Sequence, residues 1–421
     1  MADPAAGAAP RLALCGECDW LVRLPDRALG QRAHCPRCYH HLTGPARSGL
    51  QPLLAWLCAA LILLALVFVF PFLGFSSHGV GHTMNFADTV GALVADDYGI
   101  LAALLLATTV GLPGLYLIAL LYLCLGARPG RRLPGAIAIA RRIRPLEPWM
   151  MTDVFVVGVL VSLIKIISLA DIQVHASFIA FCGYSLALIQ AMRLIDWVRL
   201  WDSLVPPPQP PPGVTAGAPG HRQSVVACRA CDTPFVAATP TACPRCGKHH
   251  RLRHINRLQW TWALLVTATI AYIPANTYPV LSTEQLGNTE PQTIVGGVLH
   301  LAASGDWPIA AIIFLASIVV PISKIIAMGW LCIMAAREKR PNASLTHTRA
   351  YRVTEKIGRW SMIDVFVVAV LATLVQAGSL ISIQPGPGAI AFASVVVLTM
   401  IAALVFDTRL LWPNESHAHE R

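Results

Sequence analysis

The chain has 421 residues, of which 55% are hydrophobic and only 13% charged, and its formal net charge is +10. Soluble domains carry roughly 25% charged residues, so the composition excludes an ordinary water-soluble globular protein and indicates a polytopic membrane protein. The positive charge would suit nucleic-acid binding, but a membrane protein also needs Lys and Arg on its cytoplasmic loops.

The N-terminal region contains two CxxC pairs, and a similar region recurs near the middle of the chain. Four thiolates in two such pairs suit Zn²⁺, which takes a closed tetrahedral Cys₄ set in structural sites. Redox dithiol chemistry, an open catalytic zinc site and a ligand role for nearby histidines such as His34 and His250 are the alternatives. The expected zinc ligands are Cys15, Cys18, Cys35 and Cys38 in the first module, and Cys228, Cys231, Cys243 and Cys246 in the second.

Long apolar stretches follow each cysteine module. A transmembrane helix needs about 20 predominantly apolar residues. Eight stretches meet this requirement, at roughly 53–73, 100–125, 151–169, 177–198, 258–280, 309–336, 363–383 and 389–412. The sequence therefore predicts an all-α polytopic membrane protein with eight transmembrane helices.

The charges between these stretches are sorted by sign. The loops 74–99 and 281–308 contain Asp and Glu but no Lys or Arg, whereas the segments 128–144 and 337–359 are rich in basic residues. Basic loops face the cytoplasm, so we expect both termini and the centre of the chain inside and the acidic loops outside. No signal peptide is recognisable before the first span, which would itself direct insertion. The net charge then reflects topology and not nucleic-acid binding.

A proline run at 206–212, extended by glycines to residue 220, cannot support a packed core and predicts a semi-rigid linker. It divides the chain into two halves of similar plan. The expected organisation is a zinc module (1–49), a four-helix repeat (50–204), the linker (205–224), a second zinc module (225–256), a second four-helix repeat (257–412) and a tail (413–421).

The two halves also share a sequence motif. The segment from Trp149 to Leu160 matches the segment from Trp360 to Leu371, with Asp153 in register with Asp364. Apolar helices that resemble each other by chance rarely keep a Trp and an Asp in register. Because each half would start inside and have four spans, we expect two parallel repeats, between which transporters often place their binding site.

Ionisable residues stand inside several expected spans, where they are costly and indicate function. Lys324 and Lys165 are far from either end of their spans, and Ser168 shares a helix face with Lys165. Asp153 and Asp364 lie near the cytoplasmic starts of theirs. These groups either make interhelical pairs and reach lipid headgroups, or form a polar network between the halves, such as Lys324 with Asp364, that changes partners or protonation as cargo moves.

The duplicated order of cysteine module and four spans, together with the Trp149/Trp360 and Asp153/Asp364 motif, resembles the paraquat-inducible protein A family. The resemblance extends from Cys15 to Trp412. It implies a protein of the Gram-negative inner membrane that works with a periplasmic MCE-domain partner (PqiB- or LetB-like), which forms a tunnel for phospholipids between the two membranes.

The resemblance also implies roles for individual residues. It makes the eight cysteines zinc-ribbon ligands. The halves differ, since Lys165 is matched by Gln376 and Lys324 by Tyr116, so a symmetric pair of sites is not expected. The candidate residues of the transport path are Lys165, Lys324, Ser317, Ser361 and Asp364.

These features favour a non-enzymatic lipid transport subunit, and the sequence contains no Walker A motif, GxSxG elbow or HExxH motif. Such a subunit would take phospholipid from the inner membrane, or accept it on return, and would draw energy from the proton gradient or from partner binding. Two alternatives are a membrane anchor that docks the tunnel without carrying cargo, and a membrane redox protein that uses the CxxC pairs.

Overall fold

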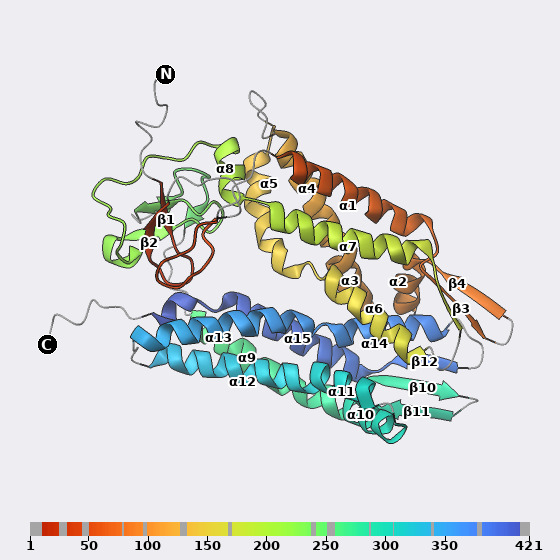
Figure 1. Ribbon diagram of the computed structural model, residues 1–421. Coiled ribbons are helices and arrows are strands. Elements are labelled where there is room, and N and C mark those ends of the chain that lie inside the picture. Colours follow the sequence, from red (N-terminus) through yellow and green to blue (C-terminus); the bar gives the residue numbers. More distant parts are fainter. Residues whose placement is uncertain are drawn as a thin grey trace.

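The computed structural model consists mainly of helices, with small β modules at both ends of two helical bundles (Figure 1). Small cysteine-bearing modules lie at one end, called here the ribbon end, and two three-stranded sheets lie at the other, called the sheet end. The structure describes residues 11–24, 32–43, 50–77, 80–95, 99–126, 133–166, 171–236, 241–250, 257–285, 288–305, 307–337, 341–376 and 381–412.

The first half contains four long helical segments joined by short strands. Its helices are α1 (Gln51–Val69), α2 (Phe86–Ala95), α3 (Gly99–Leu106), the π-helix η1 (Ala107–Gly111), α4 (Leu112–Gly126), α5 (Ala136–Ile143), the 3₁₀ helix η2 (Arg144–Trp149), α6 (Thr152–Ile166), α7 (Ala176–Leu194) and α8 (Trp197–Leu204). Its strands are β3 (Leu73–Ser77), β4 (Val80–Met84) and β5 (Asp171–Val174), which form an antiparallel sheet in the order β4-β3-β5.

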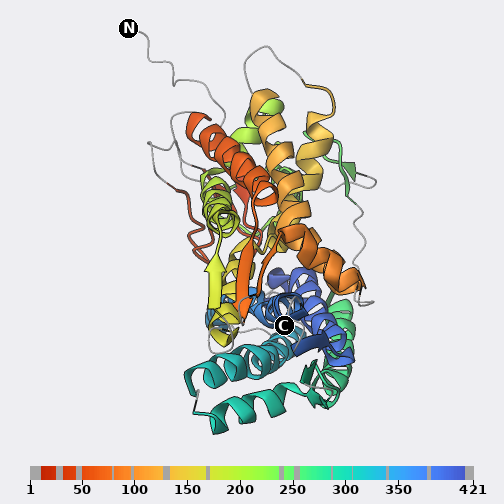
Figure 2. The ribbon, with the colours of Figure 1, turned by 90° about the vertical axis from the view of Figure 1, so that its right-hand side faces the viewer.

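The second half repeats this order of elements. Its helices are α9 (Arg257–Thr277), α10 (Ile294–Ala303), α11 (Trp307–Phe314), the π-helix η4 (Leu315–Val319), α12 (Val320–Ala336), α13 (Pro341–Trp360), α14 (Ile363–Gln376), α15 (Pro387–Val405) and the 3₁₀ helix η5 (Thr408–Leu411). Its strands are β10 (Leu281–Gln285), β11 (Asn288–Gln292) and β12 (Ile381–Pro385), in the order β11-β10-β12. Figure 2 shows the first half, in red to yellow, above the second, in green to blue.

Six segments of the described chain are long and apolar enough to cross a membrane, and the protein is a multi-pass membrane protein. They are Gln51–Val69, Gly99–Gly126, Ala136–Leu163, Ala176–Leu194, Ala310–Ala336 and Pro387–Val405. The other two expected spans coincide with α9, which has polar residues at both ends, and α14, which has only 14 residues.

A π-helix precedes a proline in each half, at Pro113 and Pro321. Proline lacks the N–H that an α-helix needs, and one wider turn accommodates this loss. In η1 the hydroxyls of Thr108 and Thr109 donate to the carbonyls of Leu104 and Leu105, at 2.7 and 2.6 Å. The wide turn is therefore stabilised by side chains from inside the same helix.

The halves meet where α6 packs against α14. The Phe155 and Phe366 rings lie edge to face at 5.5 Å, and the Ser162 hydroxyl donates to the Gly158 carbonyl at 2.9 Å and to the Val367 carbonyl at 3.5 Å. Gly158 has no side chain to separate the two backbones, which is the usual way for membrane helices to pack closely. Both helices belong to the shared sequence motif, so the duplicated segments form the centre of the molecule.

Candidate metal centres and the buried lysine

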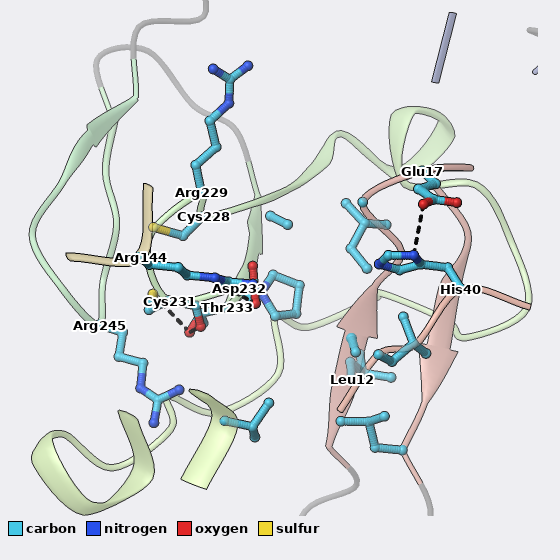
Figure 3. A pocket seen from close by; sticks show the side chains of 18 of the residues that line it. Leu12, Glu17, His40, Arg144, Cys228, Arg229, Cys231, Asp232, Thr233 and Arg245 are labelled. Carbon is cyan, nitrogen blue, oxygen red and sulfur yellow. Dashed lines mark hydrogen bonds and ion pairs between the residues drawn. The ribbon is translucent and has the colours of Figure 1, made fainter. Parts of the chain in front are cut away.

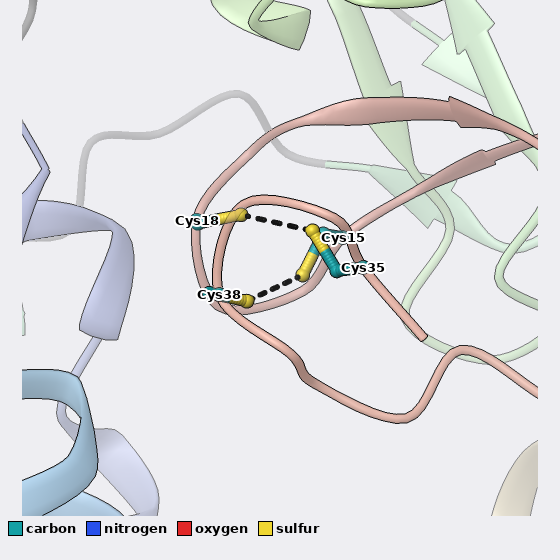
Figure 4. Close-up of side chains that lie close together, drawn as sticks. All are labelled: Cys15, Cys18, Cys35 and Cys38. Carbon is teal, nitrogen blue, oxygen red and sulfur yellow. Dashed lines mark hydrogen bonds between the residues drawn. The ribbon is translucent and has the colours of Figure 1, made fainter. Parts of the chain in front are cut away.

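The first cysteine module, called here ribbon 1, comprises the described residues 11–24 and 32–43. The strands β1 (Leu12–Leu14) and β2 (Leu21–Arg23) form a hairpin around its first CxxC pair. Each pair is closed by a residue in the left-handed conformation, Asp19 at φ 57° and Tyr39 at φ 61°. Their N–H groups donate to the carbonyls of Cys15 and Cys35, at 3.1 and 2.9 Å. These turns aim four sulfur atoms at one point (Figure 4).

The second module, ribbon 2, comprises the described residues 225–236 and 241–250. Its strands are β6 (Val225–Ala227), β7 (Pro234–Val236), β8 (Thr241–Ala242) and β9 (His249–His250). Its two CxxC turns end in the same way, at Asp232 with φ 53° and Gly247 with φ 70°. The two modules thus reach one local geometry from different sequences.

The sulfur atoms of each module fit a tetrahedral metal ion. The Sγ atoms of Cys15 and Cys38, and those of Cys18 and Cys35, are 3.5 Å apart, and all four lie within 4.8 Å of one another. A Zn–S bond of about 2.3 Å implies sulfur separations of roughly 3.8 Å in a tetrahedron.

Ribbon 2 has the same spacing, with Cys228 and Cys246 at 3.5 Å and Cys231 and Cys243 at 3.6 Å. Burial raises the pKa of the Cys246 thiol to about 11, so four buried thiolates need a cation beside them. Each of the two clusters could therefore hold one metal ion. The neighbouring His40 belongs to neither cluster, because its Nδ1 pairs with Glu17 at 2.9 Å.

Ribbon 1 docks mainly on the second half, although its Arg11 also pairs with Asp202 of α8 in the first half at 2.6 Å. Arg352 of α13 donates from Nε to Glu17 at 2.8 Å and from Nη2 to the Cys38 carbonyl at 2.9 Å. The Arg37 guanidinium lies over the Trp412 ring at 4.5 Å. These contacts fix ribbon 1 to the ribbon end of α13 and to the segment after α15.

Ribbon 2 docks on the first half in turn. Its Asp232 pairs with Arg144 of η2 at 2.5 Å, and its Arg245 pairs with Asp202 of α8 at 2.7 Å. The ribbons also contact each other, since β1 lies against β6 and β7, and Leu14 and Leu21 are buried together with Val225. The two modules are therefore exchanged between the halves and form one body.

A cleft of about 960 Å³ lies between the two ribbons and is bordered by helix ends of both halves (Figure 3). Both ribbons contribute to its wall, as do η2, α8, α13 and the proline run. Its charged lining includes seven Arg and Lys residues, namely Arg11, Arg144, Arg229, Arg245, Lys248, Arg257 and Arg409, and five acids, namely Glu17, Asp202, Asp232, Glu355 and Asp407.

Lys324 is buried in α12, with only 4% of its surface exposed. The end of its side chain lies against α13 at Gly358. A Cβ atom added to Gly358 would be only 2.8 Å from the Nζ atom of Lys324. Among the side chains that the structure describes, Glu355 is the carboxylate that acts on this ammonium, and no ion pair to Nζ is present. The expected partner, Asp364, has a side chain outside the described residues.

The other expected transport residues are spread over several elements. Ser317 is buried in η4, which packs against α14, and Ser361 is buried at the break between α13 and α14. Asp153 is half-buried in the first turn of α6. Ser168 and the side chain of Lys165 lie outside the described residues.

In the first half, Tyr116 takes the place of Lys324 three residues after the helix proline. Its hydroxyl and the Trp197 indole Nε1 both donate to one carboxylate oxygen of Glu147, each at 2.9 Å. The sequence analysis did not identify Glu147 or Glu355, because both lie in basic segments that are expected at the cytoplasmic face of the membrane. Their positions shortly before Trp149 and Trp360 were the signal that could have revealed them.

Comparison with known proteins adds to this geometry. The family model described as Paraquat-inducible protein A matches residues 50–205 and 258–415. The chain is 40% identical to the Intermembrane transport protein PqiA of Escherichia coli K12, over 97% of both chains. It is 29% identical to the Lipophilic envelope-spanning tunnel protein A of the same organism, over 97% of this chain and 92% of that one.

A Probable intermembrane transport protein of Haemophilus influenzae is 27% identical, over 94% of this chain and 95% of that protein. These relatives are named for transport and not for an enzymatic reaction. No solved structure matches the chain.

Proposed function

Because the chain belongs to the paraquat-inducible protein A family, we propose that it is the inner-membrane subunit of a lipid transport system. In this proposal it passes phospholipids between the inner membrane and a tunnel of a periplasmic MCE-domain protein, and so maintains the cell envelope. The observation that carries the proposal is the 40% identity, over nearly the whole chain, to a protein named for intermembrane transport.

The proposed topology has eight spans in two parallel four-helix repeats, with the ribbon end in the cytoplasm. The recurring element order and the recurring sheet order support a duplicated unit. Arg144, Arg257 and Arg352 lie at the ribbon end, whereas Asp88 and Glu284 belong to elements of the sheet end. This distribution agrees with the retention of basic residues on the cytoplasmic side.

We assign Zn²⁺ to both cysteine clusters as a structural ion. A closed set of four thiolates leaves no open position for a substrate, and each ribbon is too small to build a core of its own. When bound, the ion supplies the cross-link that holds the two CxxC turns together. The protein's own residues, such as Arg352 and Arg245, then attach the ribbons to the membrane helices.

The proposed transport site is the polar set within the membrane. Lys324, Ser317 and Ser361 are buried in the second half. A buried polar group without a fixed partner is costly in a membrane and is retained where it serves a function. The remaining members of the set are Asp364, Lys165, Ser168 and Asp153.

The test is phospholipid flux and outer-membrane integrity in cells that produce Lys324→Ala or Asp364→Ala and lack redundant transport systems. We expect both variants to lose most transport at normal protein level. Ser323→Ala is the matched control, since Ser323 is the exposed neighbour of Lys324 on α12. Normal flux in both variants would refute the role of this site. Lipid resolved between the halves in a complex with the partner would separate transport from mere anchoring.

A further inference from the structure

The helix α13 links ribbon 1 to the buried lysine. Arg352, Glu355 and Gly358 are spaced three residues apart, so each is a neighbour of the next, and the row winds about 120° around the helix from Arg352 to Gly358. Arg352 is bound by Glu17 and the Cys38 carbonyl of ribbon 1. Gly358, two turns further, is the point where the side chain of Lys324 touches the helix.

Gly358 makes room for the end of the lysine side chain. An added Cβ would lie 2.7 Å from Cε and 2.8 Å from Nζ of Lys324, closer than real Cβ contacts. The ammonium therefore rests directly on the backbone of α13, within about one turn of Glu355. Since the side chain of Lys324 is 4% exposed, its charge is otherwise surrounded by apolar helix.

Glu355 differs from Lys324 in that it is exposed. Its side chain lines the cleft between the two ribbons, together with Tyr351. The charged groups that act on it are Lys324, Arg359 on the next turn of α13, and Glu17 and His40 of ribbon 1. Of the other helices packed against α12, α15 and η4 have no ionisable residue, and the charged residue of α9 is Arg257 at its start. The 3₁₀ helix η5 carries Arg409, which pairs with Asp19 of ribbon 1 at 3.4 Å. Glu355 is thus the acid that connects the cleft with the buried lysine.

The equivalent place in the first half is closed. Tyr116 is neutral, and the Glu147 oxygen that it binds also accepts the Trp197 indole hydrogen. Glu147 does not line the cleft, although its neighbours Arg144 and Pro145 do. The first half therefore has a carboxylate that accepts from two neutral donors away from the cleft, and the second half has an ionisable pair beside the cleft.

We propose that Glu355 is the counter-charge of Lys324, and that the cleft between the ribbons gives this pair access to cytoplasmic water. A proton from that water can enter at the Glu355 carboxylate and pass to the Lys324 amine, which leaves the carboxylate ionised again. The inference rests on the proposed function for the cytoplasmic position of the ribbon end. It adds to that function the side from which the lysine exchanges protons.

The first test is a double-mutant cycle on the thermal unfolding of the full-length purified protein. Glu355→Gln leaves a buried cation without its counter-charge, so we expect its melting temperature to fall by roughly 2 °C. In a Lys324→Met background the same change should have little effect. The matched cycle in the first half uses Tyr116→Phe and Glu147→Gln. An equal fall for Glu355→Gln in both backgrounds would overturn the pairing.

The second test measures water access with a charged, membrane-impermeant thiol reagent on inverted membrane vesicles. Labelling of Glu355→Cys is compared with that of Ser323→Cys, which is exposed on the outside of α12. Peptide mapping by mass spectrometry measures the label on the introduced cysteine separately from the label on the zinc-ligand cysteines and on the native cysteines of the spans. We expect labelling of Glu355→Cys at least tenfold faster than that of Ser323→Cys, and only in inverted vesicles.

Absence of labelling in a Glu355→Cys protein that melts like the wild type would overturn the water-filled cleft. Labelling only in right-side-out vesicles would overturn cytoplasmic access and would also contradict the proposed topology. Loss or retention of phospholipid flux enters neither test, so a failure of the transport proposal leaves both readouts interpretable.

Discussion

The contact between α6 and α14 can be tested at a single glycine. An alanine methyl at Gly158 would lie 3.1 Å from the Phe366 Cβ and 3.5 Å from the Ile363 carbonyl oxygen. Carbon atoms pack best at about 3.5–4.0 Å, so the helices must separate by roughly half an ångström. Overpacking of this kind costs about 1–3 kcal/mol, and the better helix propensity of alanine offsets up to about 1 kcal/mol of it. We therefore expect Gly158→Ala to lower the stability by about 0.5–2 kcal/mol.

Gly329→Ala in α12 provides the matched control, because no atom beyond its chain neighbours and the adjacent backbone of α12 lies within 4 Å of the added methyl group. It should gain about 0.5–1 kcal/mol from helix propensity alone. Thermal unfolding of the purified proteins in one detergent should give the highest melting temperature for Gly329→Ala, an intermediate one for the wild type and the lowest for Gly158→Ala. If Gly158→Ala were as stable as Gly329→Ala, the close packing of the two halves would be refuted.

Three further predictions concern the ribbons. Elemental analysis should find about two zinc ions per chain, reduced by one in Cys15→Ser and unchanged in Cys58→Ser, which alters an exposed cysteine of α1. Arg352→Ala should speed proteolysis within ribbon 1 several-fold, whereas Arg349→Ala, an exposed position on the same helix, should not. Burial opposes the charged form of His40, but the hydrogen bond and charge of Glu17 outweigh it and raise the pKa of His40 above its ordinary 6.5. A raised pKa stabilises the folded state most at low pH, so the gap in melting temperature between wild type and His40→Gln should be widest below pH 6.5 and close as the pH rises; a constant gap would contradict the pair.

The cysteine clusters were predictable because they are local. Each CxxC pair sets the spacing of its own two sulfur atoms, and only two hairpin-like turns must then meet to complete a cluster. The exchange of the ribbons between the halves was not predictable in the same way. It depends on single long-range contacts, such as Arg352 with Glu17 and Arg245 with Asp202, which leave no periodic pattern in the sequence.

The in-membrane residues show a similar division. The cost of an ionisable side chain among apolar residues singled out Lys324, and the structure buries this side chain. Its neighbour Glu355 was overlooked because a charge in a basic segment is expected at the cytoplasmic surface of the membrane. The helix α13 instead runs beside α12, with Gly358 against the lysine. Sequence periodicity predicts the helices and strands, but the burial of a residue depends on how those helices and strands pack.

The difference between Tyr116 and Lys324 explains how a protein with two similar halves can have a single buried charge that exchanges protons from one side of the membrane. Two identical halves with a buried lysine each would carry two desolvated charges, and each would need a counter-charge and a path for water. Here one half has a neutral hydroxyl that donates to Glu147, which removes the first charge at no loss of hydrogen bonding. The other half keeps the ammonium, the adjacent Glu355 and the cleft formed by both ribbons. Because ribbon 1 is bound to α13 and ribbon 2 to η2 and α8, a movement of one half against the other would also change the walls of the cleft beside Glu355.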